Sequence, residues 1–233
     1  MEPIPTYIIE VSNLSKSYGK KKVLSSIFFQ ACQGECIGIL GANGCGKSTL
    51  LAILSGCLKA DTGTISYLGK KIEKRQDFHL SVGYVPQENP LFLSLTVLDN
   101  LRYFYANSVI PLKEDLENGI PHIFGLTSCK KTKVKHLSGG MKRRLAIACA
   151  LACHPPILIL DEPSASLDFV CKEDIKNYLS FYRKHGGTII LTSHEQSEIE
   201  LCSHLFLLEN GSLSPLDANT ITPAILTERM RQL

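Results

Sequence analysis

Segment 41–49, Gly-Ala-Asn-Gly-Cys-Gly-Lys-Ser-Thr, has the residue types and spacing of a phosphate-binding loop. Its three glycines let the backbone fold tightly, so that consecutive N–H groups face phosphate oxygens in front of a helix N-terminus. We expect Lys47 to reach the β- and γ-phosphates of a nucleotide and Ser48 to ligate Mg²⁺. A glycine-rich turn that binds nothing is disfavoured, because the lysine, the hydroxyl and the flanking elements are all in place. The predicted phosphate-binding residues are Gly41, Asn43, Gly44, Cys45, Gly46, Lys47, Ser48 and Thr49.

A second chemical signal is a pair of adjacent acids, Asp161 and Glu162, directly after the apolar run 157–160. Ligands of open α/β sheets bind at the carboxyl ends of strands, which is where these carboxylates are expected. Asp161 can hold a metal directly or through water, and Glu162 is then free to polarise an attacking water as a general base. Acids at a strand end can also be ordinary surface residues. Together with the phosphate-binding loop, they favour a P-loop nucleoside triphosphatase.

The elements that position these residues alternate between strand and helix. The run 36–40 is apolar throughout, as expected for a strand buried on both faces, and a helix over about 46–58 follows the loop. The carboxyl-terminal half predicts a parallel sheet covered by helices. Strands are predicted at 7–11, 23–31, 64–68, 157–160 and 188–192, helices at 97–105, 141–152 and 171–185, and a closing hairpin at 205–216 around an Asn-Gly turn.

Composition limits the classes of function. The 233 residues suit one sizeable domain, and 25 basic against 22 acidic side chains give a net charge of +3, too even for a dedicated nucleic-acid binder. The basic clusters 20–22 and 130–135 are interpreted as solvated loops, although a basic loop can also lie near anionic lipid. No apolar stretch approaches the roughly 20 residues needed to cross a bilayer, so any membrane role is expected to depend on another protein.

Nine cysteines would indicate a disulfide framework in a small secreted chain. Residues 1–7, however, carry neither the basic start nor the apolar region of a signal peptide, which favours a reduced cytosolic setting. No Cys-x-x-Cys pair is present, and the nearest helical pair, Cys149 and Cys153, lies in an apolar run. We therefore interpret the cysteines as small core residues rather than metal ligands.

The class of nucleoside triphosphatase is indicated by segment 137–141, Leu-Ser-Gly-Gly-Met, just before Asp161. Taken alone, Ser138, Gly139 and Gly140 are either a plain helix N-cap or an anion site made of free N–H groups and a hydroxyl. In its context, the segment resembles the signature motif of the nucleotide-binding domains of ABC transporters, which normally reads Leu-Ser-Gly-Gly-Gln. Met141 replaces that glutamine.

Further landmarks of the family follow in the same order along almost the whole chain. Tyr18 is similar to the aromatic that stacks on adenine, and Gln87 resembles the Q-loop glutamine that touches Mg²⁺ or water and faces the membrane partner. Asp168 resembles the D-loop aspartate, and His194 resembles the switch histidine that contacts the γ-phosphate. The resemblance thus implies that Glu162, His194, Lys47 and Gln87 act in catalysis. It also implies Ser48, Gln87 and Asp161 as metal ligands.

The resemblance implies one ABC ATP-binding domain over 1–233, of the α/β class with a parallel-sheet P-loop core. An amino-terminal antiparallel β subdomain and an inserted helical subdomain complete this fold. Residues 1–88 and 153–216 are expected to form the ATP-binding core and 89–152 the helical signature subdomain, followed by a short tail at 217–233. Ala60 departs from many relatives, which have proline there, but removes no phosphate ligand.

In the family, two such domains bind head to tail around two ATP molecules, so the implied partners are a second ATP-binding subunit, expected to be an identical chain, and transmembrane permease subunits. The implied location is peripheral, on the cytoplasmic side of the cell membrane, with ATP and Mg²⁺ as cofactors. Segment 138–145 resembles the branch that exports drugs, polysaccharides or lipids, which favours export over import.

The alternative is a soluble ATPase of the same family that acts on a macromolecular assembly without transport. Ribosome-acting relatives usually join two ATPase domains, and DNA-repair relatives carry long coiled-coil insertions; this sequence has neither. A scaffold-assembly ATPase stays open. A small-molecule kinase is disfavoured, because no lid or acceptor pocket is evident beside the signature motif.

Overall fold

The computed structural model describes residues 7–72, 78 and 81–216. The expected carboxyl-terminal tail, 217–233, lies outside the described residues, as do residues 1–6 of the segment in which we found no signal-peptide pattern. Within the described residues, no helix combines the length and the apolar composition that a membrane span requires.

The centre of the molecule is a six-stranded sheet in the order β10-β9-β3-β8-β7-β6. Every residue of β3, β7 and β8 is buried, as their continuous apolar sequences predict. Neighbouring strands from β9 to β6 run parallel, and β10 pairs antiparallel with β9 in the predicted hairpin. The strands are β3 (Cys36–Leu40), β6 (Val82–Val85), β7 (Ile157–Asp161), β8 (Thr188–Thr192), β9 (His204–Glu209) and β10 (Ser212–Leu216).

A second, antiparallel sheet has the order β2-β1-β4-β5. Its strands are β1 (Tyr7–Tyr18), β2 (Lys21–Cys32), β4 (Thr62–Tyr67) and β5 (Lys70–Lys71). β1 extends well beyond the predicted 7–11, because irregularities in its register with β2 let the ribbon bend and continue, whereas β2 differs from the predicted 23–31 by at most two residues at either end. β4 ends one residue before the predicted Leu68, since Leu68 and Gly69 both adopt positive φ in the turn to β5.

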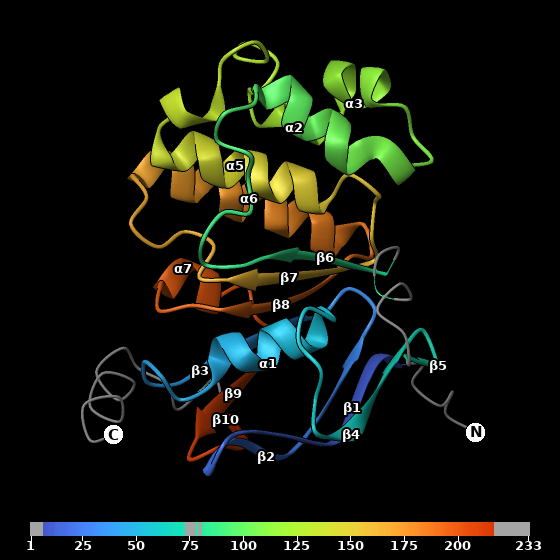
Figure 1. Ribbon diagram of the computed structural model, residues 1–233, viewed down its shortest axis with the longest axis vertical. Helices are drawn as coiled ribbons and strands as arrows, with labels where there is room; N and C mark the ends of the chain where they lie inside the picture. The colour runs from blue at the N-terminus through green and yellow to red at the C-terminus, as the bar shows by residue number, and fades with distance from the viewer. Residues whose placement is uncertain (1–6, 73–77, 79–80, 217–233) are drawn as a thin grey trace.

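The helices form layers on both sides of the large sheet (Figure 1). The helix α1 lies between strands β6–β8 and the antiparallel sheet, whereas α5 and α6 cover the opposite face, with α2 and α3 beyond them. The helices are α1 (Lys47–Leu54), α2 (Val97–Phe104), α3 (Leu112–Asn118), α4 (Ile120–Ile123), α5 (Gly139–Ala150), α6 (Phe169–Lys184) and α7 (Gln196–Ile199), with short 3₁₀ turns at η2 (Tyr105–Asn107) and η3 (Val134–His136). The α/β class with an antiparallel sheet and a helical segment is therefore confirmed.

Helix boundaries differ from the prediction where capping decides them. α1 ends at Leu54 rather than near Leu58, because the chain turns at Gly56, whose φ is 75°. α5 and α6 each begin two residues earlier than predicted, since Ser138 and Asp168 cap them by accepting hydrogen bonds from backbone N–H groups.

The cysteines agree only in part with their interpretation as core residues. Cys36, Cys149 and Cys171 are buried, whereas Cys57 is exposed and the other five are half-buried. Over the part of the chain that the structure describes, histidine, cysteine and acidic side chains form no group of three that could hold a metal ion.

Candidate active site

The phosphate-binding loop connects the end of β3 to the start of α1. Gly41, Gly44 and Gly46 have φ values of 155°, 79° and 115°, in the region that favours glycine. A Cβ at Gly41 would lie 2.5 Å from the Leu208 carbonyl oxygen of β9, so this position also needs glycine for close approach. The loop is thus shaped by backbone conformations that side chains would obstruct.

Lys47 is the first residue of α1 and is buried despite its charge. Its Nζ donates hydrogen bonds to the carbonyl oxygens of Gly41 at 2.6 Å and Ala42 at 3.2 Å. No side chain caps the N-terminus of α1, so its first-turn N–H groups have no side-chain acceptor. A positive side chain and open N–H donors therefore meet at one helix end, an arrangement suited to an anion.

The paired acids lie at the carboxyl end of β7 and have different environments. Asp161 is 3% exposed, and its Oδ1 accepts a hydrogen bond from Thr192 Oγ1 at 2.6 Å. Glu162 has a φ of 47°, and its N–H donates to the Thr192 carbonyl oxygen at 3.1 Å. A left-handed conformation is uncommon for glutamate and is held here by the neighbouring strand, which places Glu162 beyond the sheet edge.

Gln87, Glu162 and His194 come together because they follow neighbouring strands. β6, β7 and β8 are adjacent and parallel, so their carboxyl ends share one edge of the sheet. The Nε2 of His194 lies 3.4 Å from Glu162 Oε1. Sequence motifs up to 107 residues apart (194 − 87) are therefore neighbours in space.

These side chains share a cleft of about 450 Å³ with the phosphate-binding loop. Its volume is within the range of small-molecule sites. The lining consists of Val23, Asn43, Gly44, Gly46, Lys47, Ser48, Thr49, Gln87, Glu162 and His194. Nine of these ten residues were predicted from the sequence; Val23 was not.

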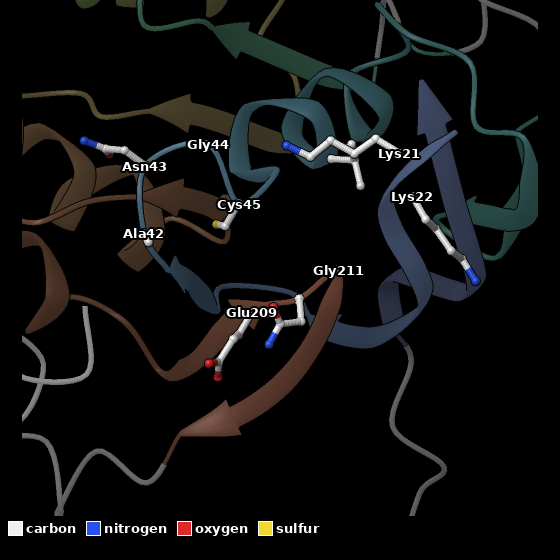
Figure 2. A pocket seen from close by; sticks show the side chains of 10 residues that line it. Lys21, Lys22, Ala42, Asn43, Gly44, Cys45, Glu209 and Gly211 are labelled. Atoms are coloured by element: carbon white, nitrogen blue, oxygen red, sulfur yellow. The ribbon is translucent and has the colours of Figure 1, made fainter. Parts of the chain in front are cut away.

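A second cleft of about 470 Å³ shares Val23, Asn43 and Gly44 with the first. Figure 2 shows loop residues Asn43, Gly44 and Cys45 on one side and the β9–β10 turn at Glu209 and Gly211 on the other. Lys21 and Lys22 of β2 also line it, so part of the basic cluster interpreted as a solvated loop faces a cleft. Apart from the phosphate-binding loop, no motif in the sequence predicted the residues of this cleft.

Other predicted residues line neither cleft. Asp161 is buried behind Glu162, and Tyr18 is 51% exposed, with Lys16 Nζ 5.8 Å from its ring centroid. Gly41 directly follows β3 and lies close to Leu208 of β9. Ser138, Gly139 and Gly140 begin α5, and Asp168 caps α6 by accepting from the Cys171 N–H at 2.9 Å. The chain therefore does not bring its own signature segment into either cleft.

Comparisons with known proteins agree with this arrangement. Residues 24–165 match the family model described as "ABC transporter". The chain belongs to the ABC transporter family. The resemblance inferred from the signature and its neighbouring motifs is thereby confirmed.

Relatives in the ABC transporter family include proteins named for both directions of transport. The Nod factor export ATP-binding protein I of Rhizobium meliloti is 39% identical over 89% of this chain and 63% of its own length. The methionine import ATP-binding protein MetN of Chlamydia felis is 35% identical over 96% of this chain and 70% of its own. The chain thus spans less than two thirds of the exporter protein.

Among solved structures, an ATP-binding cassette described as dimeric, in a post-hydrolysis state with ADP and Pi, has a TM-score of 0.80. It is 25% identical, and the match covers 90% of this chain and 99% of that one. The α/β architecture is therefore the architecture of an ABC cassette.

Proposed function

We propose that this chain binds and hydrolyses ATP with Mg²⁺ as the nucleotide-binding subunit of an ABC transporter. It powers a separate transmembrane partner, with export favoured. The observation that carries the proposal is the single cleft lined by the phosphate-binding loop, Gln87, Glu162 and His194. These groups are far apart in the sequence but meet in one cleft, which supports phosphoryl transfer to water.

The residues present fit a magnesium nucleotide. The loop N–H groups and Lys47 suit the phosphates, and Mg²⁺ prefers oxygen ligands such as the Ser48 hydroxyl, the Gln87 amide and the Asp161 carboxylate. Because Asp161 is buried behind the cleft, it suits a role through water. The metal would neutralise charge on the phosphate oxygens.

The second cleft fits the nucleoside part of the same ligand. It adjoins the phosphate cleft through Val23, Asn43 and Gly44, and Tyr18 is the register partner of Lys21 across the β1–β2 ladder. We propose that the base and sugar extend along this side, where the exposed Tyr18 ring can stack.

Glu162 is the proposed general base. Its carboxylate lines the cleft, whereas Asp161 is turned inward to Thr192, so the two acids are suited to different tasks. His194 lies 3.4 Å from Glu162, close enough to orient it or to contact a phosphate oxygen beside it. Gln87 lines the same cleft from the segment that follows β6 and is suited to position the water.

We propose that a second copy of the chain completes the site head to tail. Ser138 and Gly139 are exposed at the N-terminus of α5 and do not line the clefts of their own chain. An exposed helix N-terminus is suited to an anion offered by another subunit. Asp168, at the start of α6, is proposed to lie at the same contact.

The membrane partner is proposed to contact the segment after Gln87. Phe92, Leu93, Leu95 and Tyr103 are exposed there, and Phe92 packs edge-on against Tyr103 with ring centroids 4.9 Å apart. Such a patch is typical of interaction sites. In this proposal, 1–88 and 153–216 form the ATP-binding core, 89–152 carries movement outward, and the subunit is peripheral on the cytoplasmic side.

The proposal is tested with Glu162→Gln. The amide is a poor base, so the hydrolysis rate should fall about a hundredfold or more, while ATP-dependent dimers accumulate and are seen by size-exclusion chromatography. Glu195→Gln is the matched control, since Glu195 pairs with Lys172 and lines neither cleft. Turnover near the wild-type rate in Glu162→Gln would remove Glu162 from the base role.

The partner is tested by co-purification from membranes. Recovery of a multi-span membrane protein supports the transporter subunit. Recovery of only a soluble assembly would instead establish the alternative, an ABC ATPase without transport.

A further inference from the structure

Arg143 is a buried arginine of α5 to which the sequence motifs assign no role. It lies on the signature helix, five residues after Ser138, and is 4% exposed. Burying a guanidinium group is costly unless its donors are satisfied. The contacts of Arg143 show how this cost is offset.

All three guanidinium nitrogens donate hydrogen bonds. Nε donates to the Pro163 carbonyl oxygen at 2.9 Å, and Nη2 donates to the carbonyl oxygens of Asp161 at 2.6 Å and Glu162 at 3.2 Å. Nη1 donates to the Pro86 carbonyl oxygen at 2.6 Å and to Asn89 Oδ1 at 3.1 Å. One planar fork therefore joins the segment that carries Glu162 to the segment that carries Gln87.

These acceptors are adjacent to the groups that do the proposed chemistry. Pro86 immediately precedes Gln87, and the Glu162 carbonyl belongs to the proposed base itself, whose φ is 47°. A residue held in a sparsely populated conformation depends on its surroundings to stay there. The Arg143 fork is one of the contacts that hold this backbone.

A buried acid connects the same arginine to the histidine segment. Glu198 of α7 is 2% exposed and interacts electrostatically with Arg143. It also accepts a hydrogen bond from Ser193, the residue before His194. Burial lowers the pKa of Arg143 to about 10, and Glu198 opposes that shift, so Arg143 stays charged at neutral pH.

We propose that Arg143 is a positioning residue that couples the signature helix to Glu162 and Gln87, so that a displacement of α5 is transmitted to the base and the water-positioning amide. The inference rests on the proposed function. It adds a connection within one chain between the end of α5 that meets a second subunit and the hydrolytic groups.

The test is Arg143→Lys, assayed for hydrolysis and ATP binding. Lysine keeps the charge but presents a single ammonium group, which does not reproduce the planar fork. If Glu162 and Gln87 are misplaced, the hydrolysis step slows, whereas ATP is still bound by the phosphate-binding loop. We therefore expect kcat to fall about tenfold or more, with KM and the ATP dissociation constant within about twofold of the wild-type values.

Arg183→Lys is the matched control, because Arg183 also donates to a backbone carbonyl, that of Leu201, and lines neither cleft. Thermal unfolding of both variants separates lost stability from lost positioning. Should Arg143→Lys not fold, Asn89→Ala removes a single acceptor, and a smaller fall in kcat, about threefold, is then expected.

The outcomes separate this inference from the function on which it rests. If the wild-type chain dimerises with ATP but does not hydrolyse it, both the proposed function and the role of Arg143 are overturned. A wild-type chain that hydrolyses ATP, together with an Arg143→Lys variant of unchanged kcat, overturns only the role of Arg143. A fall in ATP affinity that matches the fall in kcat also overturns it, since this would indicate general disruption.

Discussion

Two helix N-termini in this chain, at α1 and α5, are both rich in glycine but have different surroundings. The α1 end has no side-chain cap, and Lys47 lies buried beside it. The α5 end is capped by Ser138, whose hydroxyl accepts from the Met141 N–H at 3.2 Å. The first lines a cleft with Glu162 and His194, whereas the second lies on the surface.

The difference shows what each helix end can do alone. The α1 end has a cation, a hydroxyl and shaped walls within one chain, so it is expected to bind phosphate unaided. The α5 end offers exposed N–H donors without walls around them. A ligand held there needs a second surface, which in our proposal is the nucleotide bound to another copy.

Removing the cation at the α1 end is expected to give the largest effect. In Lys47→Ala, the phosphates lose a charge-assisted contact, and ATP affinity should fall about a hundredfold. Equilibrium titration measures it. Lys113→Ala, on an exposed position of α3, provides the control. If ATP affinity is unchanged in Lys47→Ala, the α1 end does not bind phosphate through this lysine, and the contrast with the α5 end fails.

The α5 end should respond differently when its hydroxyl is removed. Ser138→Ala should leave ATP binding by the monomer intact but reduce hydrolysis about tenfold, because the serine acts only across the proposed subunit contact. Steady-state turnover at several protein concentrations measures the effect.

Thr96→Ala is the matched control for Ser138→Ala. Thr96 caps α2 in the same way, accepting from the Asp99 N–H at 3.1 Å, and either change should cost about 1 kcal/mol of stability. Equal turnover in the two variants, or normal hydrolysis by a strict monomer, would exclude a role for the α5 end.

The smallest chemical change is the addition of one methyl group at each end. Gly46→Ala should destabilise the fold by about 1–3 kcal/mol, since φ is 115° and the new Cβ would lie 2.8 Å from Val23 Cγ1. Gly139→Ala should change stability by less than about 0.5 kcal/mol, because an added Cβ would meet no atom within 4 Å beyond its chain neighbours and the backbone of its own helix. Urea unfolding compares them. If Gly46→Ala and Gly139→Ala lost similar amounts of unfolding free energy, the α5 end would be as tightly packed as the α1 end.

Local patterns predicted most of the central sheet. The apolar runs at 36–40, 157–160 and 188–192 became buried strands, because a strand covered on both faces buries every side chain of such a sequence. Strand β6 was not predicted from its four residues, since its identity depends on pairing with β7 rather than on its own pattern.

The candidate site was predictable to the extent that its chemistry is local. The phosphate-binding loop is contiguous, and its glycine positions follow from backbone conformation alone. Arg143 was not predictable, because its acceptors lie up to 57 residues away and are mostly backbone carbonyls, which carry no sequence signal. The β9–β10 hairpin was predicted, but neither its turn nor Val23 was predicted to line a cleft, because only long-range packing brings them beside the phosphate-binding loop.

The amino-acid sequence by itself determined where the buried strands lie. It also predicted which residues would hold phosphate and which acids would assist hydrolysis. These properties depend on side-chain chemistry and on contacts between near neighbours in the chain. Tertiary structure alone decided that Gln87, Glu162 and His194 share one edge, since strand order is set by long-range pairing. It also decided that the signature segment lines neither cleft, because the packing of α5 against the rest of the fold fixes where that segment lies.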